Sequence, residues 1–101
     1  MTYIAERELS AIHPKHGAIT IRLKIGTPYA VGEADWACPV VLDGLYSRLA
    51  DQHGVDSWQA LMLAQHLART LLKDFVSSGG HILSEPGGKQ IDVDQLFIRG
   101  I

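Results

Sequence analysis

Residues 55–80 read VDSWQALMLAQHLARTLLKDFVSSGG and combine a helix start, an apolar stripe at helical spacing and a helix stop. Asp56 can accept a hydrogen bond from the amide of Gln59, and the Gln59 side chain can reach back, as in a capping box. The glycine pair at 79–80 provides a left-handed exit from the last turn. The sequence therefore predicts one long helix over residues 57–77.

The apolar side chains of this helix cover an arc that is wider than one packed face needs. At steps of about 100° per residue, the arc holds Ala60, Leu61, Leu63, Ala64, Leu67, Ala68, Leu71, Leu72 and Phe75. Trp58 and Met62 lie one turn apart and interrupt the polar side instead. If a sheet covers the arc, Trp58 and Met62 stay outside that contact, and they need a second apolar partner.

The first 25 residues are typical of a β-hairpin. Residues 19–25 alternate strictly between isoleucine or leucine and polar side chains, and residues 4–12 form the preceding strand. The connecting loop at 13–17 contains proline and glycine. Pairing Ile12 with Ala18 places Glu8 opposite Arg22, and each such pair contributes about 0.2–1 kcal/mol. This face is expected to meet water, and the face of Leu9 to meet the core.

Asp43 and Gly44 separate two apolar runs and predict a second hairpin. A two-residue turn would pair Leu42 with Leu45 and Cys38 with residue 49. A short helix over residues 45–52 is the alternative interpretation. Residues 26–35 are expected to form a connecting loop because they contain two glycines and a proline.

After the helix, residues 81–83 are predicted to form a short strand, and residues 90–98 a last strand. The fold class is therefore α+β. We expect an antiparallel sheet of four to six strands, including the two N-terminal hairpins, with one long amphipathic helix packed on one face. A chain of 101 residues is expected to form a single domain over residues 1–101.

Composition restricts the classes of partner. A formal net charge of −2 gives no electrostatic reason to expect nucleic acid or an anionic membrane. No window has the ~18 apolar residues of a membrane span, and the first ten residues do not resemble a signal peptide. One cysteine excludes an intrachain disulfide. The expected location is the cytoplasm, with no nucleic-acid or membrane partner and no cofactor.

The histidines and paired carboxylates are interpreted as solvated groups. His13 and His16 would lie at a hairpin tip, outside the fixed i,i+4 geometry of a helical zinc pair. His66 has no carboxylate one turn away to orient it. Asp92 and Asp94 could in principle hold a divalent ion, but such alternation usually marks the wet face of a strand. We therefore assign no metal ligands and no catalytic residues.

Cys38 lies in the segment W-A-C-P-V, which lacks the electropositive setting of a reactive thiol. We interpret it as a core residue. If the protein were a small enzyme or ligand carrier, Cys38 and His53 would be its candidate ligand-binding residues, in a groove between the helix and the second hairpin. A histidine that meets Asp35, Asp51 or the thiol in a deep pocket would favour this hypothesis.

The apolar excess is the positive functional signal. The candidate interface residues are Trp58, Met62, Tyr46 and Trp36, because aromatic residues and methionine are enriched in protein interfaces. The alternative is that residues 26–35 or the second hairpin fold over Trp58 within the same chain.

The segments G-V-D-S-W-Q-A-L-M-L-A (residues 54–64) and W-A-C-P-V-V-L-D-G-L (residues 36–45) resemble a family of short, uncharacterised bacterial proteins. An E-R-E-L strand at residues 6–9 extends the resemblance. It implies a bacterial origin and an α+β domain, and it carries over no catalytic residue.

The leading functional hypothesis is a non-enzymatic protein-interaction module that self-associates, as a dimer or other homo-oligomer, or binds a protein partner. A toxin-neutralising immunity protein is a more specific version, by analogy with other small, mildly acidic proteins. The small enzyme or ligand-binding domain described above is the alternative from another class.

Overall fold

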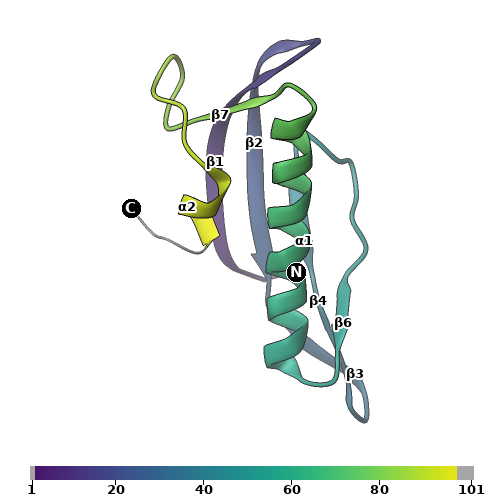
Figure 1. Ribbon diagram of the computed structural model, residues 1–101. Helices are drawn as coiled ribbons and strands as arrows, with labels where there is room; N and C mark the ends of the chain where they lie inside the picture. The colour runs from purple at the N-terminus through teal and green to yellow at the C-terminus, as the bar shows by residue number, and fades with distance from the viewer. Residues whose placement is uncertain (1, 98–101) are drawn as a thin grey trace.

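The computed structural model describes residues 2–97 and has two antiparallel sheets with a long helix along one face (Figure 1). The elements are β1 (Tyr3–His13), β2 (Gly17–Gly26), β3 (Tyr29–Gly32), β4 (Asp35–Cys38), β5 (Val40–Asp43), β6 (Gln52–Gly54), α1 (Ser57–Ser77), β7 (His81–Leu83) and α2 (Val93–Phe97). The larger sheet has the order β5-β2-β1-β7, and the smaller one β3-β4-β6. This arrangement confirms the α+β class.

The start of α1 is fixed by two reciprocal hydrogen bonds. The Asp56 carboxylate accepts from the Gln59 amide at 2.8 Å, and Gln59 Oε1 accepts from the Val55 amide at 2.8 Å. In a standard capping box the Gln59 side chain would accept from the amide of the cap residue, Asp56. Here it accepts from the amide of Val55, one residue earlier. Both bonds satisfy amides at a helix end that has no intrahelical acceptors for them. The predicted helix bounds are confirmed.

The end of α1 is a Schellman motif. Gly79 donates to the Val76 carbonyl at 3.1 Å, and Gly80 donates to the Phe75 carbonyl at 3.0 Å. Gly79 has the left-handed φ of +103° that this motif requires. At Gly80 the requirement is space, since a Cβ would lie 2.5 Å from the Phe75 ring. The glycine pair therefore ends the helix, as the sequence predicts.

The first hairpin has the predicted register. β1 and β2 pair Ile12 with Ala18, Glu8 with Arg22, and Glu6 with Lys24. The Arg22 guanidinium lies 3.6 Å from the Glu8 carboxylate on an exposed face. Alternation along the strand puts Leu9 on the other face, where it is buried.

Residues 26–35 are not a loop, contrary to the sequence-based expectation. Tyr29–Gly32 form β3, which pairs with β4 and makes a hairpin whose turn includes Ala34 at φ +52°. A left-handed alanine in a turn is uncommon, so the sequence carries no signal for this hairpin. β2 pairs with β5, and β3, which follows β2 after Thr27 and Pro28, pairs with β4. Because β4 and β5 are also consecutive in the chain, these two pairings join the two sheets.

The turn at Asp43 and Gly44 reverses the chain, but the predicted second hairpin has the wrong register. Cys38 pairs with Gln52 of β6, where a two-residue turn would have paired it with Leu49. Residues 45–51 form neither the predicted strand nor the alternative helix. Leu45 and Leu49 instead pack against the core, partly buried. Even partial burial of two leucines offsets the modest net gain of a few ladder hydrogen bonds.

The C-terminal segment forms a helix, where the sequence predicts a strand over residues 90–98. The predicted strand at 81–83 is confirmed as β7, and Gln90 makes a single bridge to Leu83. The chain then enters α2, and Ile98 lies outside the described residues. α2 begins with a capping box, since the Asp92 amide donates to Gln95 Oε1 at 3.0 Å.

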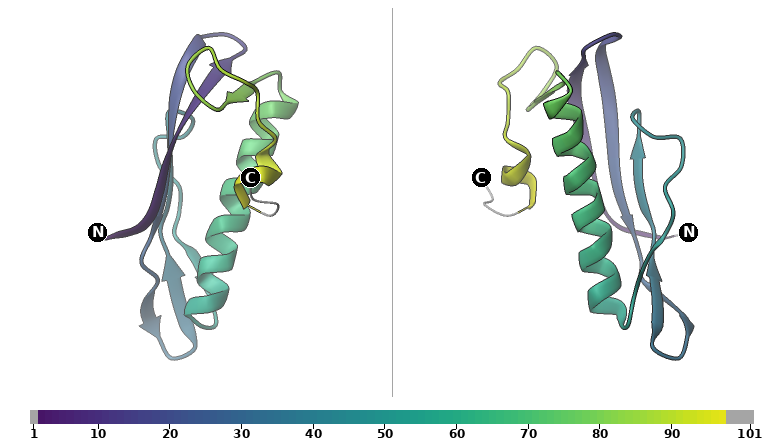
Figure 2. Two further views of the ribbon diagram at one scale, coloured as in Figure 1. Left: turned by 90° about the vertical axis from the view of Figure 1, so that its left-hand side faces the viewer. Right: turned by 45° about the vertical axis from the view of Figure 1, so that its right-hand side comes forward.

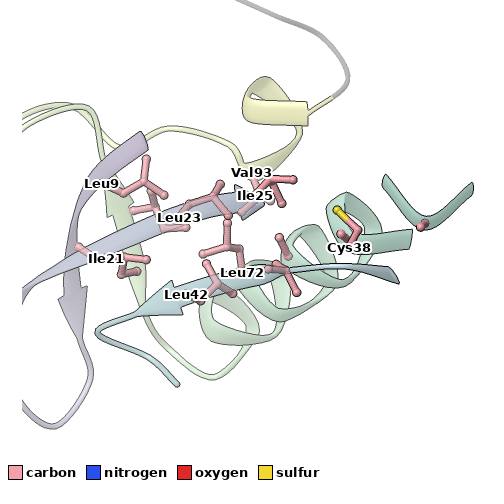
Figure 3. Packing of buried hydrophobic residues seen from close by; sticks show 14 residues of the cluster. Leu9, Ile21, Leu23, Ile25, Cys38, Leu42, Leu72 and Val93 are labelled. Carbon is pink, nitrogen blue, oxygen red and sulfur yellow. The ribbon is translucent and has the colours of Figure 1, made fainter. Parts of the chain in front are cut away.

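The core lies between the larger sheet and the two helices, and β4 adds Cys38 at one end (Figure 3). Both helices lie on the same face of the sheets, and α2 lies beside α1 (Figure 2). The buried residues of this core are Leu9, Ala11, Ile21, Leu23, Ile25, Cys38, Val40, Leu42, Ala60, Ala64, Ala68, Leu72, Ile82 and Val93. Over residues 2–97, no helix has the length and apolar character needed to cross a membrane.

Candidate functional site

Trp58 and Met62 lie on an open face of α1. The Trp58 side chain is 71% exposed and that of Met62 is 37% exposed, so nothing in residues 2–97 folds over the indole. Val55 is exposed just before the helix, and Gln59 and His66 are exposed beside the pair. We call Val55, Trp58, Gln59, Met62 and His66 the Trp58–Met62 surface.

The N-terminal half of α1 carries no charged residue. Between Asp56 and Arg69, residues 57–68 contain no aspartate, glutamate, lysine or arginine, although more than half of α1 faces away from the core. An exposed helix face usually carries charges, whereas the centre of a protein interface is depleted of them. The Trp58–Met62 surface therefore contains no aspartate, glutamate, lysine or arginine, and its two large side chains are apolar.

The C-terminal half of the same helix face is covered by the chain itself. Arg69 Nε lies 2.9 Å from Asp94 Oδ1, and Lys73 Nζ lies 3.1 Å from the same oxygen. These contacts hold the pKa of Asp94 below its ordinary value, chiefly through the hydrogen bond from Arg69 and then through that from Lys73. The ion pairs fasten α2 to α1 and leave the first turns of α1 open.

The other two predicted interface residues do not join this surface. Trp36 pairs with Gly54 in the smaller sheet, and its ring is half-buried against the core. Tyr46 lines a small depression with Phe75 near the C-terminal end of α1, so most of the helix separates it from Trp58. Tyr46 is a candidate from the sequence only by its residue type and by its place in the predicted second hairpin, and the structure does not bring it near Trp58.

Cys38 and His53, the predicted ligand-binding residues, face opposite sides of the smaller sheet. Cys38 pairs with Gln52 and belongs to the core, whereas His53 is exposed and pairs with Ala37, so alternation puts them on different faces. The Cys38 thiol donates to the Gly26 carbonyl at 3.3 Å. Burial, and to a smaller extent Asp51, raises the pKa of this thiol. These properties fit a structural cysteine.

The outer face of the smaller sheet brings together two polar pairs, and one of them joins His53 to Asp35, a contact that would favour the ligand-binding hypothesis only in a deep pocket. His53 Nδ1 lies 2.9 Å from Asp35 Oδ1, and both side chains are about half exposed. Tyr29 donates to Asp51 Oδ2 at 2.6 Å, and this hydrogen bond raises the pKa of Tyr29. The signal that was missed is β3 itself, because only that strand places Tyr29 beside Ala37.

The remaining histidines are used locally. His13 Nδ1 accepts from the amides of Lys15 and His16 at the tip of the first hairpin, and His81 contacts Gln90. Asp94 of the predicted carboxylate pair is engaged by α1, and Asp92 begins α2. In the part of the chain that the structure describes, no three histidine, cysteine or carboxylate side chains converge as metal ligands.

Fold and surface define the class: a small α+β protein with two antiparallel sheets, a long helix on one face and an apolar surface at the start of that helix. The chain belongs to the family DUF6968, described as a domain of unknown function, whose sequence model matches residues 5–91. The match spans β1 to β7 and ends before α2. No curated protein and no solved structure matches the chain.

Proposed function

We propose that this protein is a non-enzymatic interaction module that pairs with a second copy of itself through the Trp58–Met62 surface. The observation that carries the proposal is the 71% exposure of Trp58 within three helical turns that bear no formal charge. Tryptophan is one of the residue types enriched among the side chains that dominate binding energy. A partner that covers the exposed indole on this helix removes apolar surface from water.

The absence of charge over residues 57–68 favours a second copy as that partner. A two-fold contact places the same surface on both sides, so any charge would lie near its own copy. A neutral, apolar face avoids this repulsion. Packing two α1 helices against each other lets Trp58 of one copy cover Met62 of the other, because residues four apart share a face.

The association is expected to be weak. Full burial of a large apolar side chain contributes about 1.5–3 kcal/mol, and two copies of Trp58 and Met62 bury four such groups in part. Loss of translational and rotational freedom opposes this with at least about 4 kcal/mol. The surplus is therefore at most about 8 kcal/mol, which sets about 1 µM as the tightest possible dissociation constant, and partial burial weakens it to tens of micromolar or more.

Sedimentation equilibrium between about 10 and 500 µM tests the proposal. The wild type should show a reversible monomer–dimer equilibrium, and Trp58→Glu should remain monomeric. Val31→Glu is the matched control, since Val31 is 53% exposed on β3, a strand of the smaller sheet. It should associate as the wild type does. A wild type that stays monomeric throughout, or a Trp58→Glu variant that still dimerises, would contradict the proposal.

A further inference from the structure

Met62 is an accessible methionine in the middle of the Trp58–Met62 surface. The chain has two methionines, and Met62 is the only one within residues 2–97. It is 37% exposed and does not belong to the cluster of side chains that builds the core. Because the oxidation of a side-chain sulfur follows its exposure, the Met62 thioether is open to a small oxidant.

The second sulfur within residues 2–97 is shielded. Cys38 is fully buried, and its thiol donates to the Gly26 carbonyl at 3.3 Å. Burial raises the pKa of this thiol, so the reactive thiolate is scarce at neutral pH. Among residues 2–97, a peroxide therefore meets one exposed sulfur atom, that of Met62.

The helix positions around Met62 offer a partner little other apolar surface. Its neighbours three and four positions away are Trp58, Gln59, Gln65 and His66. The Gln59 side chain is engaged at the start of α1, where it accepts from the Val55 amide. The apolar contact that this part of α1 can make therefore depends on the Trp58 indole and on the Met62 thioether.

We propose that Met62 is a site of reversible oxidation by peroxides, and that its sulfoxide closes the Trp58–Met62 surface to a second copy; this inference rests on the proposed dimer. Hydrogen peroxide transfers one oxygen atom to the Met62 sulfur. The S–O bond forms, the O–O bond breaks and water leaves, so the sulfur loses the two electrons that the peroxide gains. A methionine sulfoxide reductase reverses the step with two thiols, which become a disulfide as the oxygen leaves as water.

Oxidation changes the character of the side chain and leaves its place on the helix unchanged. A thioether is flexible and apolar, and it packs favourably against an aromatic ring. The sulfoxide is polar, and burying a polar group without a matching hydrogen bond is costly. A two-fold contact carries this group on both sides. We therefore expect the dissociation constant of the dimer to rise at least about tenfold.

The weakness of the expected association makes Met62 available to the oxidant. With a dissociation constant of tens of micromolar or more, most chains are monomeric at low micromolar concentration. Each monomer exposes its Met62 side chain, whereas the dimer covers it. Oxidised chains leave the monomer–dimer equilibrium, and further dimers dissociate to restore it.

The fold itself is expected to tolerate the sulfoxide. The buried side chains of α1 are Ala60, Ala64, Ala68 and Leu72. Met62 lies outside this row, so in the monomer its sulfoxide oxygen stays in contact with water. Loss of the dimer on oxidation can therefore be separated from unfolding.

Treating the full chain with about 10 mM hydrogen peroxide tests the proposal. Mass spectrometry of proteolytic peptides should find the added oxygen on Met62, separately from Met1, and Cys38 should stay reduced. At equal peroxide concentration, Met62 should react at least about twofold more slowly at about 500 µM protein than at about 5 µM. Sedimentation equilibrium should show a dissociation constant at least about tenfold higher after oxidation. A methionine sulfoxide reductase should restore it, with an unchanged circular dichroism spectrum throughout.

Met62→Leu is the matched control, because leucine has a similar volume and no sulfur. This variant should dimerise as the wild type does, and its dimer should persist in peroxide. Loss of the Met62→Leu dimer in peroxide would overturn the assignment of the effect to Met62. Oxidised wild type that dimerises as tightly as the untreated protein would overturn it as well.

The untreated wild type separates the two proposals. If it stays monomeric, the dimer fails, and the role of Met62 oxidation fails with it. If it dimerises and its oxidised form dimerises equally, only the role of Met62 oxidation is overturned.

Discussion

Cys38 and Gln52 lie opposite each other across β4 and β6, and this pairing determines the path of the chain between Gly44 and β6. Residues 45–51 form neither strand nor helix, and Leu45 and Leu49 pack against the core partly buried. In this segment, contact with the core therefore replaces pairing with β5.

Shortening residues 45–51 should allow this segment to pair with β5. The pairing of Cys38 with Gln52 leaves three residues more than a two-residue turn at Asp43 and Gly44 needs, and deleting residues 46–48 brings Leu42 opposite Leu45. Each ladder hydrogen bond gained contributes about 0.5–1.5 kcal/mol. We expect the free energy of unfolding to rise by about 1–3 kcal/mol in urea denaturation.

Replacing residues 46–48 by Gly-Ser-Gly is the control for this deletion, because it removes the side chains and keeps the length. It should show no gain in the free energy of unfolding over the wild type. A deletion variant that is less stable than this control would show that the three residues do not prevent the pairing.

Gly44→Ala should be among the most damaging single substitutions in the turns. Gly44 has φ +100°, and a Cβ there would lie 2.3 Å from the Thr20 carbonyl oxygen. We expect a loss of about 2–4 kcal/mol in the free energy of unfolding. Gly17→Ala is the matched control, since its φ is +73° with nothing within 4 Å of a Cβ. Equal losses for the two variants would contradict the close approach of Gly44 to β2.

The contact of Asp94 with α1 should make stability depend on pH in the acid range. The folded-state pKa of Asp94 lies below its ordinary value of 3.8, so its stabilising contribution is present above that pH and is lost as the pH falls through the folded-state value. Asp94→Asn should be less stable than the wild type at pH 7. Thermal unfolding from pH 7 to pH 2 should show the two curves converging in acid, and a constant difference would argue against the ion pairs.

The thiol of Cys38 should resist alkylation in the native protein. Burial raises its pKa and hides it from reagent, and its proton is held by the Gly26 carbonyl. Iodoacetamide at pH 8 should react with it at least about 100-fold more slowly in the folded chain than in urea. Rapid labelling of the folded protein would place the thiol at a surface, and would reopen the case for Cys38 as a ligand-binding residue.

The elements whose signals are local could be predicted from the sequence. The register of β1 and β2 follows from strict alternation and from opposite charges at Glu8 and Arg22. The bounds of α1 follow from its caps. α2 could have been found in the same way, because Asp92 and Gln95 repeat the spacing of Asp56 and Gln59. The alternation of apolar and acidic residues around Asp92 predicts a strand instead.

The elements that depend on distant contacts could not be predicted. Pairing Cys38 with Gln52 depends on where Leu45 and Leu49 find burial, which the turn at Gly44 does not specify. The candidate site divides along the same line. Trp58 and Met62 stand out by helical periodicity alone, whereas the contact of His53 with Asp35 arises from the pairing of β4 with β6, which no local pattern encodes.

Fluorescence of Trp58 provides the sharpest test of the proposed dimer. In a Trp36→Phe chain the emission reports on Trp58 alone, since the sequence contains two tryptophans. If two copies bury this side chain in each other, emission should shift to the blue as the concentration rises from about 1 to 500 µM, and Met62→Glu should abolish the shift. Emission that stays at the position of a solvated indole over the whole range would contradict self-association through this surface.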